Sequence, residues 1–177
     1  MVDIRDARVE DVPGILAIYN SVMATSTAIY REEPATLEAH VEWWRGRVAG
    51  GHPVLAAHDA DGVAGFASFG DFRPWPGYRF TVEHSVHVRA NCRGAGVGSA
   101  LMRPLIARAT AMGKHVMIAG VDAENVASLR FHERLGFVQV AHFREVGFKF
   151  GRWLDLTFLQ RFLSGPRVSG SAEAPRS

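Results

Sequence analysis

The first fifty residues carry a helical hydrophobic pattern that follows one short stretch of alternating residues. Residues 4–8 predict a strand, and Asp11 can cap the helix that comes after it. A polar segment separates this helix from a second one, predicted over residues 35–48. The pair Gly50–Gly51 is expected to end the second helix, because glycine readily adopts the conformation that closes a helix.

The hydrophobic period changes to two after the second helix, which indicates strands. Residues 53–58 and 63–69 form two predicted strands, joined by the turn sequence Asp-Ala-Asp-Gly at residues 59–62. A third strand is predicted over residues 79–88. One face of it would carry Phe80, Val82, His84, Val86 and Val88, and the other Thr81, Glu83, Ser85 and His87.

The rest of the chain alternates helices with strands. The predicted elements are a helix from a glycine-rich turn to about Met112, a strand at 116–121, a helix at 125–135, and strands at 137–146 and 154–162. This order predicts an α+β fold with a mixed sheet rather than a doubly wound one. We expect one domain over residues 1–163 and a disordered tail over residues 164–177, which are rich in Ser, Gly, Pro and Arg.

Composition narrows the classes of function. The 177 residues are 47% hydrophobic, which is enough for one buried core. Lys and Arg number 20 against 18 for Asp and Glu, without a basic run, so no nucleic-acid partner is expected. The single cysteine, Cys92, excludes a disulfide framework and a cysteine metal cluster, and no metal is expected. Because no apolar leader or membrane-spanning stretch is seen, we expect a cytoplasmic protein without a membrane partner.

The strongest local motif is the segment Arg93–Ser99, which reads Arg-Gly-Ala-Gly-Val-Gly-Ser between a predicted strand and a predicted helix. Glycines let the backbone approach a ligand closely, and the free N–H groups and dipole of a helix N-terminus favour an anion. A phosphate or pyrophosphate site is therefore predicted, with a tight structural connection as the alternative. Gly98 is not followed by the lysine of a P-loop, and the glycine spacing is not that of a dinucleotide fold.

Two motifs resemble the GNAT superfamily of acyl-CoA-dependent N-acetyltransferases, over about residues 2–162. Its pyrophosphate loop, R/Q-x-x-G-x-G/A, is matched by Arg93, Gly96 and Gly98. Its second signature, N-x-x-[SA]-x-x-x-[YH]-x-x-x-G-F, is matched by Asn125, Ser128, His132, Gly136 and Phe137. The resemblance implies a mostly antiparallel mixed sheet flanked by helices, with acetyl-CoA as cosubstrate. The implied cofactor contacts are Val86, His87, Val88, Arg93, Gly94, Ala95, Gly96, Val97, Gly98, Ser99, Asn125 and Ser128.

Three positions near these motifs carry structural predictions. Asn125 can cap its helix, and Gly136 is expected in the left-handed conformation that ends it. Pro104 predicts a kink in the helix that follows the glycine turn, because proline lacks an N–H group and clashes with the preceding turn.

Glu83 and His132 are the candidate catalytic residues. Glu83 lies in an apolar strand just before the glycine turn, where burial would raise the pKa of its carboxyl group towards the range of a useful base. The sequence 81–86 resembles that around the active-site glutamate of phosphinothricin acetyltransferases. His132 stands where many GNAT enzymes carry a tyrosine that protonates the leaving thiolate. The alternatives are an exposed strand glutamate and a histidine on the helix surface.

Three segments, residues 70–75, 81–85 and 149–155, resemble one branch: phosphinothricin and methionine sulfoximine or sulfone acetyltransferases. That branch acetylates the α-amine of glutamate-like amino acids and is linked to resistance to toxic analogues. The implied substrate contacts are Arg73, Pro74, Trp75, Glu83, His84 and Ser85. Arg73 can pair with an α-carboxylate, or it can be a solvated loop residue. The branch also implies a homodimer, with residues 148–159 as a plausible contact.

Two other functional classes stay open at this point. A GNAT acetyltransferase could instead act on a peptide N-terminus, an aminoglycoside or a polyamine, although no acidic patch suited to a polycation is evident. A module that binds acyl-CoA without catalysis is the second alternative, and the presence of both Glu83 and His132 argues against it.

Overall fold

The computed structural model describes residues 2–163, so the predicted tail at 164–177 lies outside the described residues. Its strands and α-helices follow the predicted order. They are β1 (Asp3–Asp6), α1 (Val12–Thr25), α2 (Leu37–Ala49), β2 (Val54–Asp59), β3 (Gly62–Asp71), β4 (Thr81–Val88), α3 (Val97–Ala111), β5 (Val116–Asp122), α4 (Val126–Arg134), β6 (Val138–Lys149) and β7 (Arg152–Phe162). Short 3₁₀ helices lie at Val9–Asp11, Pro76–Tyr78 and Ala90–Cys92.

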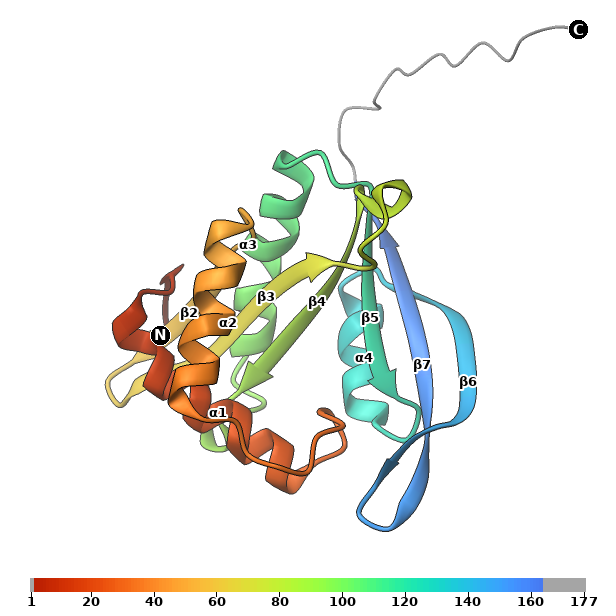
Figure 1. The fold of residues 1–177 in the computed structure, drawn as a ribbon, viewed down its shortest axis with the longest axis horizontal. Coiled ribbons are helices and arrows are strands. Elements are labelled where there is room, and N and C mark those ends of the chain that lie inside the picture. Colours follow the sequence, from red (N-terminus) through yellow and green to blue (C-terminus); the bar gives the residue numbers. More distant parts are fainter. Residues whose placement is uncertain (1, 164–177) are drawn as a thin grey trace, which may run out of the picture.

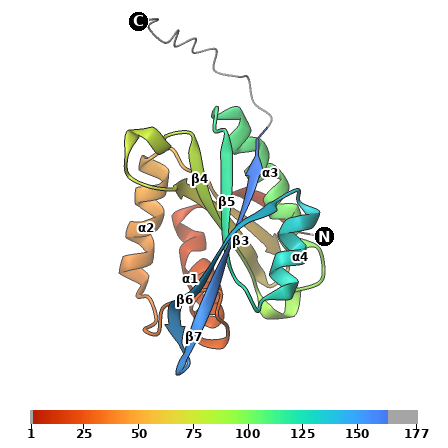
Figure 2. The same cartoon turned by 90° about the vertical axis from the view of Figure 1, so that its right-hand side faces the viewer.

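The strands form a seven-stranded sheet in the order β1-β2-β3-β4-β5-β7-β6. Every neighbouring pair is antiparallel except β4 and β5, which are parallel. Helices α1 and α2 cover one face of the sheet, and α3 and α4 cover the other (Figures 1 and 2). The predicted α+β fold with a mixed, mostly antiparallel sheet is therefore confirmed.

Alternation along the strands divides the core between the two faces. On the α1 and α2 face, Phe66 packs with Ile15, Ile18 and Val22. On the α3 and α4 face, the buried cluster includes Leu55, Ala67, Phe69, Val82, Leu101, Leu105, Met117, Ala119 and Phe137. Strand β4 follows the predicted alternation, because Val82, Val86 and Val88 pack with this second cluster while His87 contacts Phe66 on the first face.

Strands β4 and β5 pair over only three residues before they separate. The pairs are Thr81–Val116, Val82–Met117 and Glu83–Ile118. Beyond them, β5 remains paired with β7 and β4 with β3, and the two strands diverge in Figure 1. The facing edges of β4 and β5 therefore offer backbone groups without a strand partner in the described part of the chain.

Local predictions met mixed outcomes. The side chain of Asn125 accepts a hydrogen bond from the N–H of Ser128 at 3.1 Å, so the predicted cap of α4 is confirmed. Gly136 has the predicted left-handed φ of 82°. The prediction that the Asp11 side chain caps α1 was wrong. Its carboxylate instead accepts a hydrogen bond from the N–H of Arg8 at 2.7 Å and forms an ion pair with Arg5 at 2.7 Å. Helix α3 continues from Val97 to Ala111 through Pro104.

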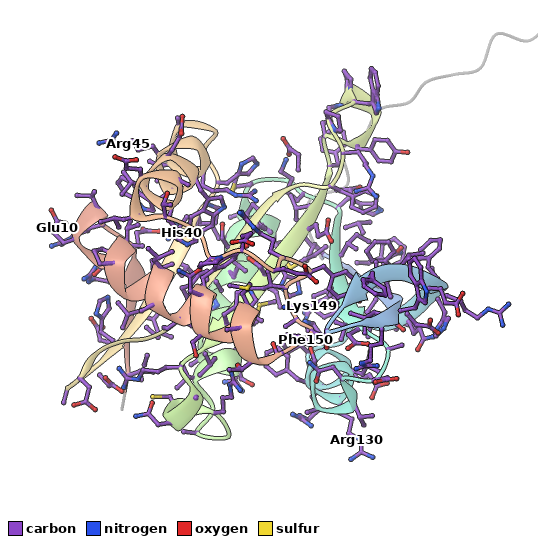
Figure 3. The ribbon with its side chains drawn as sticks, turned by 60° about the horizontal axis from the view of Figure 1, so that its bottom comes forward. Glu10, His40, Arg45, Arg130, Lys149 and Phe150 are labelled. Atoms are coloured by element: carbon purple, nitrogen blue, oxygen red, sulfur yellow. The ribbon has the colours of Figure 1, made fainter. Side chains whose placement is uncertain are left out.

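The hairpin of β6 and β7 is longer than its predicted strands. Both strands reach a tight turn at Phe150 and Gly151, whose φ angles of 52° and 73° place them in the left-handed region. This turn conformation usually selects Asn-Gly or Asp-Gly, so Phe-Gly gave no turn signal in the sequence. The longer β6 brings Lys149 into the protein, beside the end of α1 (Figure 3).

Lys149 is buried and fixes the segment between α1 and α2. Its Nζ donates to the carbonyl oxygens of Met23, Ser26 and Ile29 at 2.5, 2.8 and 2.7 Å. The side chain is only 1% exposed, and burial lowers its pKa from the ordinary value. The neighbouring hydroxyl of Thr27 donates to a carboxylate oxygen of Asp122 at the end of β5. These contacts join the α1–α2 segment to the sheet.

No helix in the described residues is long and apolar enough to cross a membrane.

Candidate active site

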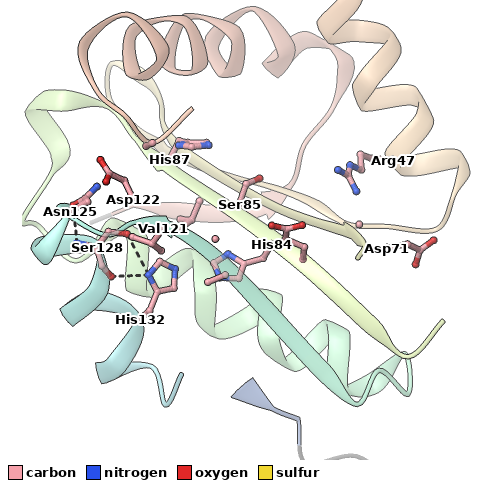
Figure 4. Close-up of a pocket in the computed structure, with 16 residues that line it drawn as sticks. Arg47, Asp71, His84, Ser85, His87, Val121, Asp122, Asn125, Ser128 and His132 are labelled. Carbon is pink, nitrogen blue, oxygen red and sulfur yellow. Dashed lines mark hydrogen bonds between the residues drawn. The ribbon is translucent and has the colours of Figure 1, made fainter. Parts of the chain in front are cut away.

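A cavity of about 340 Å³ opens where β4 and β5 separate. Figure 4 shows side chains that line it from both strands, from helix α4 and from Arg47 of α2. The lining from β4 is Glu83, His84, Ser85, Val86 and His87, and that from β5 is Ala119, Gly120, Val121 and Asp122. Because the strands part here, the cavity connects the two faces of the sheet.

Glu83 lies between two glycines on the α1 and α2 face. It is directly opposite Gly70 in the β3–β4 pairing. On its other side, a methyl group added to Gly120 of β5 would lie 3.3 Å from Oε1 of Glu83. Burial raises the pKa of Glu83, while the nearby guanidinium groups of Arg73 and Arg47 oppose that rise. Because neither glycine carries a side chain, Glu83 has neighbouring room for Arg47 on one side and for a ligand on the other, and its raised pKa makes it a better proton acceptor.

Arg47 was missed by the sequence reasoning. It is in the last turn of α2 and reaches over Gly70 into the cavity. A Cβ atom at Gly70 would overlap Nη1 of Arg47, so a side chain at position 70 would displace this guanidinium. Helical spacing offered a signal, because Arg47 follows His40, Trp43 and Trp44 on one face of α2, whereas Arg45 follows the exposed Glu38 and Glu42 on another. The contact of Arg47 with Gly70 depends on how α2 packs on β3.

His84 and His132 meet on the opposite face of β4. Their ring centroids are 5.1 Å apart, and Phe137 lies against both rings. Burial lowers the pKa of each histidine, and for His132 a hydrogen bond to the Ser128 carbonyl opposes this. His84 was predicted as a substrate contact beside Glu83 and Ser85; it lines the cavity from the other face of the strand.

The ring of His132 is oriented by its own helix. Its Nδ1 lies 2.7 Å from the carbonyl oxygen of Ser128 and 3.4 Å from the Ser128 hydroxyl. A carbonyl can only accept, so Nδ1 carries the proton and Nε2 of the neutral ring is an acceptor. Nε2 is buried and has no hydrogen-bond partner in the described residues. A neutral His132 can therefore receive a proton or a hydrogen bond at Nε2 but cannot donate one there.

The glycine turn has the backbone conformation that an anion site requires. Gly94 and Gly96 have φ angles of 79° and 82°, and Gly96 immediately precedes α3. The N–H groups of Val97, Gly98 and Ser99 then open the helix without intrahelical partners. A methyl group at Gly98 would lie 3.3 Å from the ring of Phe131, so α3 and α4 pack closely here. The backbone is therefore preformed to receive phosphate oxygens.

Several predicted contacts surround this region. Val86, His87, Asn125 and Ser128 line the cavity, and Val88 ends β4 beside the turn. Arg93 is exposed and its Nε donates to the carbonyl of Val88 at 3.3 Å. The remaining predicted cofactor contacts, Gly94, Ala95, Gly96, Val97, Gly98 and Ser99, all lie in the glycine turn and the start of α3.

The loop between β3 and β4 lies outside the cavity. Arg73 is exposed, stacks over the Phe72 ring at 4.1 Å and donates to the Phe72 carbonyl at 2.7 Å. Trp75 is 70% exposed, and neither it nor Pro74 contributes to the cavity lining. Glu83, Ser85 and Arg47 thus line one cavity, whereas Arg73, Pro74 and Trp75 are not part of its lining, although the charge of Arg73 still acts on Glu83.

Comparisons with known proteins agree with this geometry. Residues 15–137 match the family model described as the acetyltransferase (GNAT) family. An L-methionine sulfoximine/L-methionine sulfone acetyltransferase of Pseudomonas paraeruginosa is 52% identical over 165 residues, which are 93% of this chain and 96% of that protein. An L-amino acid N-acyltransferase of Escherichia coli is 45% identical over 157 residues, or 89% and 91% of the two chains.

A solved structure gives the same result. The crystal structure of a GNAT superfamily phosphinothricin acetyltransferase from Sinorhizobium meliloti in complex with acetyl-CoA is 35% identical. It superposes with a TM-score of 0.89, covering 99% of this chain and 94% of that one. The match over more than half of the chain, together with relatives of high identity and coverage, shows that this chain is an acetyl-CoA-dependent N-acetyltransferase and belongs to the acetyltransferase (GNAT) family.

Proposed function

We propose that this protein acetylates the α-amine of a small amino acid of the methionine sulfone, methionine sulfoximine or phosphinothricin type. The similar proteins from Pseudomonas and Sinorhizobium carry those substrates in their names. The observation that carries the proposal is the cavity of about 340 Å³ in which Glu83, Ser85 and Arg47 come together, because a carboxylate and a guanidinium there suit the amine and the carboxylate of an amino acid.

Glu83 acts in this proposal as the general base. The amine reaches the enzyme as an ammonium ion and must lose a proton before it can attack. The raised pKa of Glu83 makes its carboxylate a better proton acceptor than an exposed glutamate. The amine nitrogen then bonds to the acetyl carbon, the bond from that carbon to sulfur breaks, and the product is an N-acetyl amino acid with free CoA.

Acetyl-CoA would lie between β4 and β5, where it supplies the acetyl thioester. The pyrophosphate would rest on the N–H groups at the start of α3, and the unpaired edge of β4 at Val86 and Val88 could bond to the amide groups of the pantetheine arm. Asn125 and Ser128 line the same opening from α4. These features fit a long, flexible ligand with a diphosphate in its middle.

The neutral ring of His132 has no proton on Nε2, so it cannot directly protonate the leaving thiolate as a tyrosine at this position would. Its Nδ1–H is held by the Ser128 carbonyl, so we propose that Nε2 accepts a hydrogen bond or a proton at the cofactor side of the cavity. After the amine has attacked, Nε2 could take up the proton that the nitrogen releases and pass it to the departing sulfur.

Self-association is part of the proposal, because β6 is an edge strand with exposed apolar side chains. These are Val138, Val140, Phe143, Val146 and Phe148. An unpaired apolar edge favours association with another strand, and we propose a homodimer through this hairpin. Sedimentation velocity should give twice the monomer mass, whereas a monomer at micromolar concentration would contradict it.

The test of the activity is the release of free CoA thiol from acetyl-CoA in the presence of candidate acceptors. L-Methionine sulfone, L-methionine sulfoximine and phosphinothricin should give saturable turnover. A panel of peptides, aminoglycosides and polyamines serves as the control set. Turnover restricted to that control set would contradict the proposed substrate class, and the absence of thiol release with every amine tested would contradict catalysis itself.

A further inference from the structure

Arg47 is a half-buried cation in the cavity that has no protein partner. It forms no ion pair and no hydrogen bond with any residue in the range 2–163. Asp71, the nearest exposed carboxylate on that side, is instead engaged by His52 at 3.4 Å and Lys114 at 3.5 Å. Burial lowers the pKa of Arg47 from the ordinary value, with Asp71 and Glu83 opposing the shift. A guanidinium taken partly out of water without a partner is unfavourable unless a ligand supplies the anion.

The backbone of β3 is shaped to keep this guanidinium in the cavity. Gly70 is directly opposite Glu83 across the β3–β4 pair, so the two positions point to the same face of the sheet. The space that a Gly70 side chain would fill is occupied by Nη1 of Arg47. The guanidinium therefore lies at the strand position directly opposite Glu83, and Figure 4 shows Arg47 pointing from α2 toward the cavity.

An amino acid carries its α-amine and its α-carboxylate on the same carbon atom. The group that deprotonates the amine must therefore lie close to the cation that binds the carboxylate. Glu83 and Arg47 have this relation, because Arg47 lies over Gly70 and Gly70 is directly opposite Glu83. A guanidinium also matches a carboxylate with two parallel hydrogen bonds. Arg73, the other candidate, is exposed, stacks on Phe72 and donates to a backbone carbonyl, so it is outside the cavity.

We propose that Arg47, held over Gly70, binds the α-carboxylate of the acceptor and so restricts the enzyme to amino acids over simple amines. This inference rests on the proposed amino-acid acceptor and assigns the residue that recognises it.

The experiment compares L-methionine sulfone with its neutral carboxamide as acceptors, in wild-type enzyme and in Arg47→Gln. Wild-type kcat/KM should favour the acid over the amide by about 30-fold or more, since a hydrogen-bonded charge pair contributes on that order. Arg47→Gln should lose most of this preference through a higher KM for the acid, with little change for the amide. The acid-to-amide ratio of kcat/KM in wild type is divided by the same ratio in Arg47→Gln, so the difference in intrinsic reactivity between the two amines cancels.

Three further variants separate the explanations. Gly70→Ala keeps Arg47 but displaces its guanidinium, so it should reduce the preference as Arg47→Gln does. Arg45→Gln removes the same charge from the exposed face of the same helix and should behave as wild type. Arg73→Gln should retain the preference for the acid. Thermal melting of each variant confirms that it is folded.

The outcomes are distinguishable. A preference for the acid that survives Arg47→Gln, or that is lost only in Arg73→Gln, would overturn the assignment of Arg47 and leave the proposed function standing. Failure of the wild-type enzyme to turn over methionine sulfone, with turnover of other amines, would overturn the proposed function and this inference together.

Discussion

Two cations that are partly or fully buried, Lys149 and Arg47, differ in whether the protein supplies their hydrogen-bond acceptors. Lys149 enters from β6 and donates to three backbone carbonyls of the α1–α2 segment, with its side chain almost completely buried. Arg47 enters from α2 and has no bonding partner in the described part of the chain. A buried cation whose donors are all used stabilises structure, whereas one that is left free beside a cavity is available to a ligand.

The difference predicts where substitutions show their effects. Around Lys149, a change should first lower stability, because carbonyl groups lose their donor. Around Glu83 and Arg47, a change should first alter kinetics, because these side chains have little to do with holding the fold together. The following predictions sharpen that contrast.

The largest effect is expected from Glu83→Gln, which keeps the size of the side chain and removes the base. The kcat should fall by roughly 100-fold or more, while the affinity for acetyl-CoA and the melting temperature stay close to wild type. In the wild-type enzyme, kcat/KM should fall as the pH is lowered through the raised pKa of Glu83, and this acidic limb should be absent in the variant. Unchanged turnover in Glu83→Gln would eliminate Glu83 as the base.

Lys149→Met should mainly destabilise the protein. Three carbonyl groups lose a charged donor, so the free energy of unfolding should drop by about 2–4 kcal/mol, with a melting temperature lower by roughly 5–15 °C. Arg47→Gln is the matched comparison, and its melting temperature should barely change. Equal destabilisation by the two substitutions, measured by thermal or urea unfolding, would remove the contrast between the two cations.

Acid titration of the histidines of β4 should also lower the stability of the protein. Burial lowers the pKa of His87 to about 4, with Arg93 contributing, and burial also lowers the pKa of His84. The unfolded chain binds these protons near pH 6.5 and the folded chain does not, so stability should fall as the pH drops below about 6.5. The loss for His87 should be about 2 kcal/mol by pH 5, and His84 adds a loss of the same sign.

His87→Gln provides the control for this titration. Urea unfolding at pH 7 and at pH 5 should show a smaller pH dependence in the variant than in wild type. An identical dependence in both proteins would mean that His87 does not carry the effect.

Much of the fold follows from periodicity that is visible in the sequence. The alternation around Glu83 placed Glu83, Ser85 and His87 opposite Val82, Val86 and Val88, and packing on the two faces of β4 confirms this. Such alternation is set by local backbone geometry, which is why it could be predicted from consecutive residues. The same holds for the cap at Asn125, whose hydrogen bond spans only three residues.

The site itself depended on contacts that the local sequence does not encode. Arg47 and Gly70 are 23 positions apart, and only the packing of α2 on β3 puts the guanidinium where the glycine lacks a side chain. Lys149 reaches carbonyls more than 100 residues earlier in the chain, because an unexpected Phe150–Gly151 turn lengthened β6. His84 lines the cavity from the strand face that the alternation predicted for it, and its role as a substrate contact stays a prediction.

The most direct test is a crystal structure of the enzyme with CoA and L-methionine sulfone bound together. The account predicts the amino acid in the cavity between β4 and β5, with its α-carboxylate paired to the guanidinium of Arg47 and its amine towards the carboxylate of Glu83. An acceptor whose carboxylate pairs with Arg73, or one bound with its amine remote from Glu83, would contradict it.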